Sequence, residues 1–183
     1  METKTQIRNY YKAKRDAQAE DLRMQFSDRI CEHILSSDLY QNANIVYFFY
    51  PLGSEASLLS LFYETIKLGK KAAFPKITGQ EMNFFETKDI SQLKEGYFHV
   101  MEPDETQPLL TESDPLILTP GLVFDKSGVR YGYGKGFYDK YFVCYPRAKR
   151  IGVAFELQIA DCLKADTHDK LVEHIFTEKG CLF

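Results

Sequence analysis

Apolar side chains near the start of the chain recur at helical spacing. They follow one another at steps of three, four and larger multiples: Ile7, Tyr11, Leu22, Phe26, Ile30 and Ile34. This pattern predicts helical structure over residues 3–36. A helix of that length is uncommon, so we expect a break, and Ser27 or one of its neighbours is the candidate position.

Shorter apolar runs later in the chain predict strands. The β-rich run 44–50 stops at Pro51 and is typical of a buried parallel strand. Residues 58–68 return to helical spacing, with Gly69 as a plausible C-cap. Further strands are predicted at 71–74 (ending before Pro75), 82–85, 116–119, 150–155 and 172–177. The acidic, proline-containing stretch 101–115 is predicted to be a loop, and a helix is predicted from 136 to 142.

The alternation of strands and helices predicts an α/β fold with a mainly parallel sheet flanked by helices on both faces. A length of 183 residues suits a single domain, 1–183. In such sheets, ligands bind beyond the carboxyl ends of the strands. The glycine-rich stretch after the predicted strand 116–119 is therefore the expected place for a site.

Composition narrows the class of protein. Apolar residues make up 44% of the chain, which is enough for a core, yet no apolar run is long enough to span a membrane. The formal net charge of -3 argues against a nucleic-acid binder. The first residues lead into a charged stretch, so we expect no secretory signal. We therefore expect a cytoplasmic protein, a monomer, with small molecules as its partners.

Cysteine and histidine spacings indicate neither a metal site nor a redox motif. No two cysteines form a C-x-x-C pair, so reduced thiols of a cytoplasmic protein are the preferred interpretation. The histidines lack H-E-x-x-H spacing, and none is assigned a catalytic role. The residues in question are Cys31, Cys144, Cys162, Cys181, His33, His99, His168 and His174.

The segment from Arg130 to Asp139 carries the strongest chemical signal. Glycines occupy alternate positions at 132, 134 and 136, and they leave backbone N–H groups open to close approach by an anion. Arg130 and Lys135 add positive charge suited to phosphate oxygens. A helix starting near residue 137 would favour phosphate at its N-terminus. Asp139 follows, and a carboxylate beside bound phosphates is a natural magnesium ligand.

This segment departs from two common nucleotide-binding motifs. A Walker A loop would need glycine where Val129 stands, and Ser or Thr where Gly136 stands. A dinucleotide fingerprint would place its third glycine at position 137, which is Phe. The alternative is a glycine-rich turn packed by aromatics, with Arg130 and Lys135 solvated. The combination of Arg, Lys and Asp at these spacings favours phosphate binding.

Two other segments allow a structural and a functional interpretation. Lys4 and Arg8 share a helix face, and Lys12 and Arg15 continue along that side. This face either is a solvated charged surface or closes over a triphosphate. In the turn from Tyr50 to Glu55, Ser54 and Glu55 could simply cap the following helix. Alternatively, Glu55 accepts hydrogen bonds from an N–H-rich amino-pterin ring.

Taken in order, these pieces resemble the 5-formyltetrahydrofolate cyclo-ligase family. The signature-like segment is Pro120-Gly121-x-x-Phe124-Asp125-x-x-Gly128-x-Arg130-x-Gly132-x-Gly134-x-Gly136-x-Tyr138-Asp139. The spacing Lys4-x-x-x-Arg8, the turn ending at Glu55, the pair Glu102-Pro103 and the pair His168-Asp169 also match. The resemblance spans nearly the whole chain.

The resemblance implies ATP- and magnesium-dependent ring closure of 5-formyltetrahydrofolate to 5,10-methenyltetrahydrofolate, with release of ADP and phosphate. It implies an N-terminal helix that packs over the nucleotide site. It implies that ATP is held by Lys4, Arg8, Arg130, Gly132, Gly134, Lys135 and Gly136. It also implies that Arg130, Lys135 and Tyr138 are catalytic and that Leu52, Glu55 and Tyr138 line the folate site. Asp139 and Asp169 are implied to bind Mg²⁺.

The chain departs from the family pattern at two positions. Ser57 stands where many relatives have a second acidic or polar group, so whether Glu55 alone meets the pterin is open, and Tyr131 replaces a usual aliphatic residue. Two other functions stay open: a folate- or nucleotide-binding protein without turnover, and a nicotinamide-dependent oxidoreductase. The glycine spacing speaks against the second.

Overall fold

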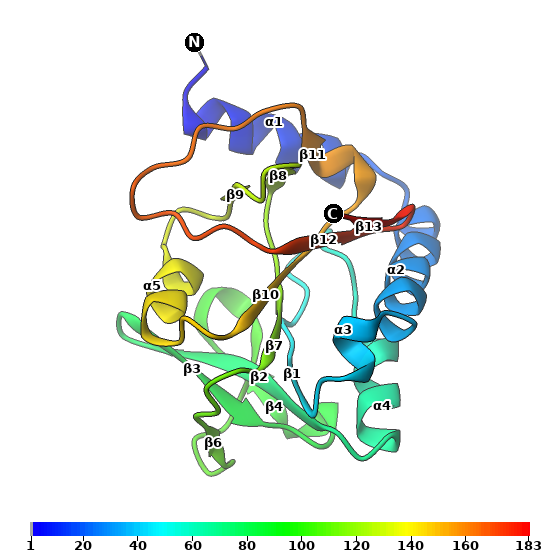
Figure 1. The fold of residues 1–183 in the computed structure, drawn as a ribbon, viewed down its shortest axis with the longest axis vertical. Helices are drawn as coiled ribbons and strands as arrows, with labels where there is room; N and C mark the ends of the chain where they lie inside the picture. Colours follow the sequence, from blue (N-terminus) through cyan, green and yellow to red (C-terminus); the bar gives the residue numbers. More distant parts are fainter. Residues whose placement is uncertain (1) are drawn as a thin grey trace.

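The computed structural model describes residues 2–183, which are arranged around a central eight-stranded sheet (Figure 1). The helices are α1 (Lys4–Asp16), α2 (Glu20–Leu35), α3 (Asp38–Gln41), α4 (Leu59–Lys67) and α5 (Phe137–Cys144), with 3-10 turns at Ile90–Gln92, Tyr97–His99 and Glu156–Gln158. The sheet contains β1 (Ile45–Tyr47), β2 (Lys71–Thr78), β3 (Glu81–Glu86), β6 (Leu109–Leu110), β7 (Leu116–Thr119), β10 (Lys149–Val153), β12 (His174–Thr177) and β13 (Gly180–Leu182).

The centre of this sheet is parallel and its edges are antiparallel. The strand order is β13-β12-β10-β7-β1-β2-β3-β6, and the five strands from β12 to β2 pair in parallel. From β1 the chain continues outward to β2, whereas β7 leads in the opposite direction to β10 and β12. Strand order therefore reverses between β1 and β7, and the crevice beyond such a reversal is the usual ligand position in open α/β sheets.

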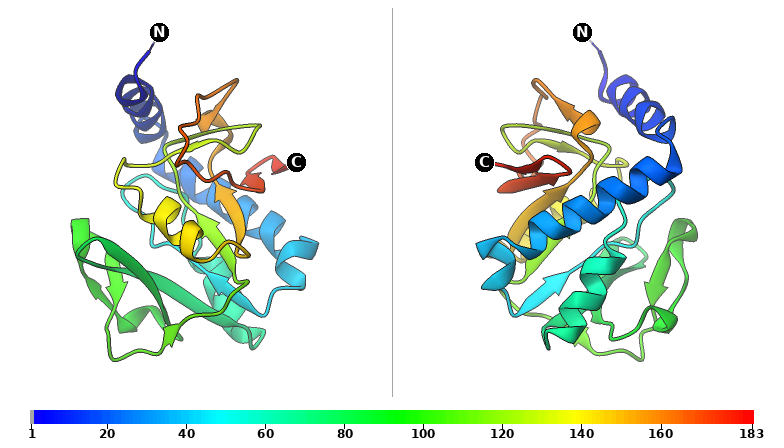
Figure 2. Two further views of the ribbon diagram at one scale, coloured as in Figure 1. Left: turned by 60° about the vertical axis from the view of Figure 1, so that its left-hand side comes forward. Right: turned by 90° about the vertical axis from the view of Figure 1, so that its right-hand side faces the viewer.

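Side-chain alternation along the central strands explains why helices cover both faces. Val46, Phe48 and Leu118 point to one face and pack with residues of α2 and α4, whereas Tyr47 and Ile117 point to the other face and pack with α5. Figure 2 shows α2 and α4 together on one side of the sheet. The predicted α/β fold with a mainly parallel sheet and helices on both faces is confirmed.

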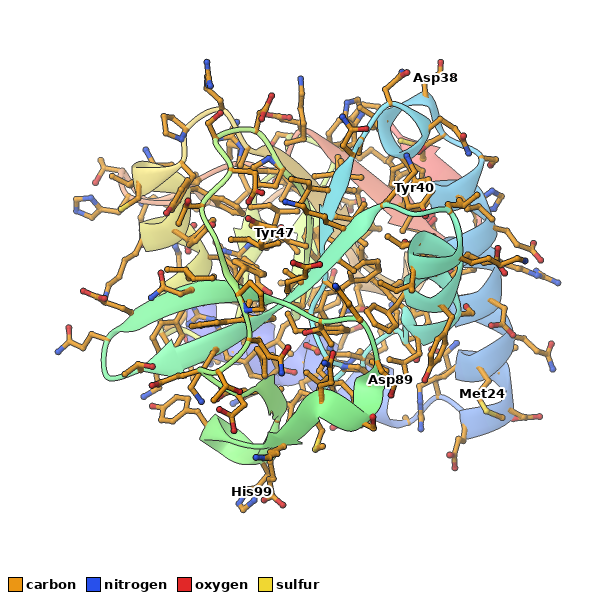
Figure 3. The ribbon with its side chains drawn as sticks, turned by 90° about the horizontal axis from the view of Figure 1, so that it is seen from below. Met24, Asp38, Tyr40, Tyr47, Asp89 and His99 are labelled. Carbon is orange, nitrogen blue, oxygen red and sulfur yellow. The ribbon has the colours of Figure 1, made fainter. Side chains whose placement is uncertain are left out.

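Tyrosines on the two faces lie deep in the core. Tyr40 and Tyr47 are fully buried, and Tyr40 shares a 2.8 Å hydrogen bond with Thr65. Figure 3 shows both rings inside the molecule, whereas the side chains of Asp38 and His99 project from its surface. These core tyrosines stand apart from the cavity described below.

The predicted N-terminal helix is interrupted, but the expected position of the break was wrong. α1 ends at Asp16, and Ala19, with ψ 143°, is the N-cap of α2, which begins at Glu20. Ser27 lies inside α2, where its hydroxyl donates to the carbonyl of Arg23 at 2.7 Å. The turn falls earlier because Arg15 is buried against the segment after β1, so α2 must change direction to lie along the sheet.

Several strand predictions were incomplete. β2 continues through Pro75. The backbone groups of Ala73 and Pro75 point toward β1, and β1 has already ended opposite Pro75. No strand there needs a hydrogen bond from the N–H that proline lacks. The predicted loop 101–115 contains β5 (Met101–Pro103), which pairs with β4 (Leu93–Glu95), and it contains β6. A small sheet of β8 (Val123–Asp125), β9 (Arg130–Tyr131) and β11 (Ile159–Ala160) was also missed.

Candidate functional site

A cavity of about 470 Å³ opens beyond the carboxyl ends of β1 and β7. All of the site residues predicted from the sequence line it: Lys4, Arg8, Leu52, Glu55, Arg130, Gly132, Gly134, Lys135, Gly136, Tyr138, Asp139 and Asp169. They come from α1, from the turn after β1, from the stretch that runs from β9 into α5, and from the loop before β12. The fold thus brings together residues that lie up to 165 positions apart.

The glycine segment between β9 and α5 has the backbone that its sequence suggests. Gly134 has φ +88° and Gly136 has φ +69°, a region that residues with side chains rarely adopt. Gly136 is the N-cap of α5, so the positive end of that helix faces the cavity lining. This arrangement can hold an anion against bare backbone.

Arg130 is buried at the base of the glycine segment. Its Nη2 donates to Oδ2 of Asp139 at 3.1 Å, and its guanidinium lies 5.6 Å from the ring centre of Tyr138. Nε is buried and has no hydrogen-bond partner among the residues described. The alternative that Arg130 is solvated was therefore wrong. Its charge is fixed beside the cavity.

α1 supplies two cations from the opposite side. Nζ of Lys4 lies 2.8 Å from Asp166 and 2.9 Å from Asp169, and Nε of Arg8 donates to the carbonyl of Gly132 at 2.8 Å. Burial acts to lower the pKa of Lys4, but the two carboxylates outweigh it and raise that pKa above its ordinary value. For these two residues, the solvated-face interpretation was wrong.

Asp139 and Asp169 reach the same cavity but do not form a preassembled metal cluster. Oδ1 of Asp139 accepts from the backbone N–H of Lys170 at 3.0 Å. Burial acts to raise the pKa of Asp169, but the backbone N–H of Asp166 and the Lys4 ammonium outweigh it, so the pKa lies below its ordinary value. Within residues 2–183 there is no group of three or more potential metal ligands. Two carboxylates beside an anion cradle still fit Mg²⁺, which takes its other ligands from water and phosphate.

Glu55 is buried in the turn after β1. One oxygen accepts from the backbone N–H of Leu52 at 2.9 Å, and the other accepts from the hydroxyl of Tyr133 at 3.0 Å and lies 3.7 Å from Nη1 of Arg15. Burial raises the pKa of Glu55, and Arg15 opposes that rise. The capping interpretation was wrong because α4 begins only at Leu59.

Arg15 and Lys12, on the same helix, have different surroundings: Lys12 is on a solvated charged face, whereas for Arg15 that interpretation was wrong. Arg15 is buried, and Lys12 forms an exposed ion pair with Asp16 at 2.6 Å instead of reaching the cavity. Tyr133, which lies between two glycines, was also missed. The sequence offered no local signal for these contacts, since Ser54 and Tyr133, which bind Arg15, lie 39 and 118 positions later in the chain.

An apolar wall completes the cavity opposite the cations. Glu102 of β5 stands beside it, buried, and accepts from the backbone N–H of Ile77 at 3.4 Å, while burial raises its pKa. The wall residues were not predicted, because β2 and β3 look like ordinary core strands in the sequence and the β4–β5 hairpin was not predicted at all. They include Tyr50, Pro75, Ile77, Met82, Tyr97, Val100 and Phe137.

The fold and the cavity define an α/β protein in which a cationic, glycine-lined end and an apolar, aromatic end meet in one space. A family model described as the 5-formyltetrahydrofolate cyclo-ligase family matches residues 1–178. The chain belongs to that family, and it is therefore an enzyme, a ligase. No helix within residues 2–183 has the length and apolar character needed to cross a membrane.

Comparisons with individual proteins agree with this membership. A mouse 5-formyltetrahydrofolate cyclo-ligase is 27% identical over 85% of this chain and 84% of its own length. The structure of Aquifex aeolicus 5,10-methenyltetrahydrofolate synthetase has a TM-score of 0.87 and 30% identity, and covers 97% of this chain and 91% of that chain. A Mycoplasma pneumoniae synthetase has a TM-score of 0.78 at 22% identity, covers 97% of this chain and 99% of that chain, and supports the fold.

Proposed function

We propose that this enzyme converts 5-formyltetrahydrofolate and ATP into 5,10-methenyltetrahydrofolate, ADP and phosphate. The observation that carries the proposal is the continuity of the cavity, in which a cradle for anions adjoins an apolar, aromatic wall. A reaction between a triphosphate and a flat ring system needs both substrates in one space. Holding them in line is the main contribution that an enzyme makes to phosphoryl transfer.

The chemistry follows from the poor leaving ability of a formamide oxygen. The formyl oxygen attacks the γ-phosphorus of ATP, and the bond to the ADP oxygen breaks. N10 then attacks the formyl carbon and loses its proton to solvent. The carbon–oxygen bond breaks, phosphate leaves with the former formyl oxygen, and the amidinium of the product remains.

At the cationic end, Lys4, Arg8 and Lys135 would bind phosphate oxygens, with the backbone of Gly132, Gly134 and Gly136 beneath them. Arg130 is held by Asp139 and Pro120, so its charge is in position before any ligand arrives. Preorganised charge of this kind stabilises the negative charge that develops during transfer. In this proposal α1 covers the nucleotide side of the cavity.

At the folate end, Leu52 and Glu55 would meet the ring edge, and Tyr138, which also lines the cavity, would lie between the two ends. Burial raises the pKa of Tyr138 well above its ordinary value, so its hydroxyl stays neutral and able to donate a hydrogen bond. The Arg130 guanidinium lies 5.6 Å from the centre of its ring and would help to hold that hydroxyl near the transferring group. We assign Arg130, Lys135 and Tyr138 to the reacting end of the site.

Mg²⁺ would neutralise charge on the phosphates when bound, with Asp139 and Asp169 as its protein ligands. Asp139→Asn is expected to raise the magnesium concentration needed for half-maximal rate, and Asp169→Asn to raise it more mildly. Because both carboxylates would act through one ion, the double variant should cost less than the sum of the single variants. A magnesium titration of the four proteins at saturating ATP measures this. Additive effects, or a normal requirement in Asp139→Asn, would remove the shared ion from the proposal.

The fate of the formyl oxygen tests the reaction itself. With ¹⁸O in the formyl group, the label is expected in the released phosphate, since that oxygen becomes the bridge to phosphorus. Mass spectrometry of the phosphate makes the measurement, and unlabelled substrate in ¹⁸O water is the control. Label that appears in water instead would rule out phosphorylation of the formyl oxygen.

A further inference from the structure

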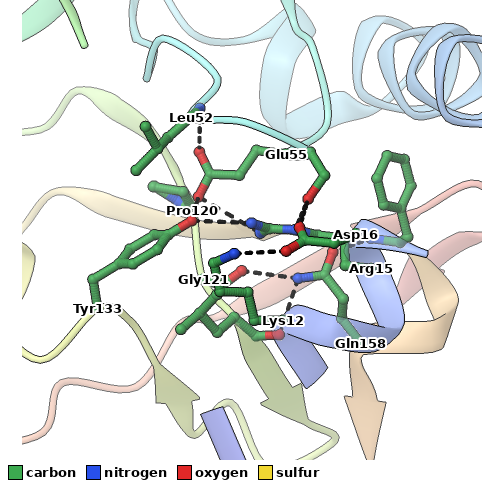
Figure 4. A network of polar contacts seen from close by, with 12 residues as sticks. Lys12, Arg15, Asp16, Leu52, Glu55, Pro120, Gly121, Tyr133 and Gln158 are labelled. Atoms are coloured by element: carbon green, nitrogen blue, oxygen red, sulfur yellow. Dashed lines mark hydrogen bonds and ion pairs between the residues drawn. The ribbon is translucent and has the colours of Figure 1, made fainter. Parts of the chain in front are cut away.

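The hydroxyl of Tyr133 connects the glycine segment to the turn that holds Glu55. It donates to Oε1 of Glu55 at 3.0 Å and accepts from Nη2 of Arg15 at 3.0 Å (Figure 4). The Tyr133 residue itself is 42% exposed, so its ring reaches inward from the edge of the cavity. A side chain on the anion-binding loop thus contacts the carboxylate assigned to the pterin.

Arg15 completes this connection from α1. Its side chain is 2% exposed, and its Nε donates to the hydroxyl of Ser54, which in turn donates to Asp16. Nη1 faces Glu55 at 3.7 Å and has no hydrogen-bond partner within the described chain. A buried guanidinium with one unmade bond is costly, so its other contacts must hold it firmly in this position. A small shift of Glu55 would complete the remaining bond.

α1 also contacts the glycine segment at two consecutive residues. Arg8 binds the carbonyl of Gly132, and Arg15 binds the hydroxyl of Tyr133. Gly134, with its Cβ direction 3.8 Å from the Arg8 guanidinium, leaves room for that side chain against the loop. Any rearrangement of the loop by a bound anion is therefore transmitted to α1 and to Glu55 through direct contacts.

We infer that Arg15 and Tyr133 are positioning residues that orient the Glu55 carboxylate, so that an occupied glycine segment strengthens binding of the folate. This inference rests on the proposed function. It assigns a role to the network of Figure 4 that a merely structural ion pair would not have. The coupling requires two sites and a connecting element, and the hydrogen bonds that link Tyr133 of the glycine segment to Glu55 and Arg15 provide that element.

The same network sets a pH dependence. The groups around Glu55 are Arg15 and Asp16 of α1, Tyr133 of the glycine segment, Tyr138 of α5 and the backbone N–H of Leu52. Burial already raises the Glu55 pKa, and the Tyr133 hydrogen bond opposes the rise. Its loss raises the pKa further, so the acid-side loss of folate affinity moves to higher pH in Tyr133→Phe.

Calorimetric titration of 5-formyltetrahydrofolate, with and without saturating β,γ-imido-ATP and Mg²⁺, tests the inference. In the unmodified enzyme the nucleotide analogue is expected to tighten folate binding about fivefold or more. In Tyr133→Phe this factor should fall to about twofold or less, because the hydroxyl that links the glycine segment to Glu55 is lost. A twofold factor lies below the range of typical coupling energies. Tyr40→Phe removes a buried tyrosine hydrogen bond far from the cavity and should keep the full factor.

Arg15→Lys provides a second variant, since lysine keeps the charge but cannot bridge Ser54 and Tyr133 together. It should lose coupling as Tyr133→Phe does. Full coupling in either variant, or none in the unmodified enzyme, overturns the inference while leaving the proposed function intact. Failure of the unmodified enzyme to bind either ligand overturns both.

Discussion

Replacing Arg130 or Lys135 with alanine should lower turnover with ATP by about 10- to 150-fold, corresponding to about 1.5–3 kcal/mol for a charge-assisted contact. Both residues line the glycine end of the cavity. The half-saturating ATP concentration should rise much more than that for 5-formyltetrahydrofolate. Steady-state kinetics with each substrate varied in turn gives both quantities.

Controls separate this effect from a general loss of positive charge. Lys126→Ala removes an exposed lysine outside the cavity and should leave the kinetics unchanged. Arg130→Lys keeps the charge but loses the planar fork that contacts Asp139 and Pro120, so partial activity is expected. Unaltered ATP constants and turnover in both alanine variants would show that the glycine segment does not hold ATP.

Gly134→Val should reduce turnover by about 100-fold or more, an effect of the size seen when a group that stabilises the transition state is lost. A side chain at this position would stand between the backbone N–H groups and the phosphates. The positive φ of +88° also strains valine, at a cost of about 1–3 kcal/mol in stability. Activity should thus fall far more than stability.

Gly79→Val is the matched control for backbone strain. Gly79 has φ +64°, lies in the turn between β2 and β3, and has no atoms within 4 Å of its Cβ direction. It should lose comparable stability, measured by denaturant unfolding, while retaining activity. A folded Gly134→Val enzyme with normal kinetics would mean that the segment is only a structural turn.

Local patterns predicted the fold well where the residues of a segment alone indicate that it is buried. The run 116–119 coincides with β7, and all four residues of β7 are buried. The edge strands were missed because their pairing depends on distant partners: β6 has two residues and pairs only with β3. Likewise, Pro75 looked like a strand end. The missing N–H of Pro75 would point toward β1, but β1 has already ended there, so β2 continues.

The residues that line the cavity likewise fall into some that the sequence revealed and some that it did not. The glycine segment was singled out because anion binding has a recognisable residue chemistry, whereas Lys4 and Arg8 were assigned to the site only through the family resemblance. The structure brings all of these residues into one space. Arg15 was not found, because a buried arginine on a basic helix has the same local pattern as a solvated one. Only the three-dimensional contact with Glu55 distinguishes them. The roles of the site residues remain predictions that the variants above test.

The absorbance of 5,10-methenyltetrahydrofolate, followed in complete mixtures and in mixtures lacking one component, tests the proposed reaction most directly. We predict that product accumulates only when 5-formyltetrahydrofolate, ATP and Mg²⁺ are all present, with ADP released in equal amount. Binding of both ligands without product, or product formed equally fast without ATP, would contradict ATP-dependent ring closure by this enzyme.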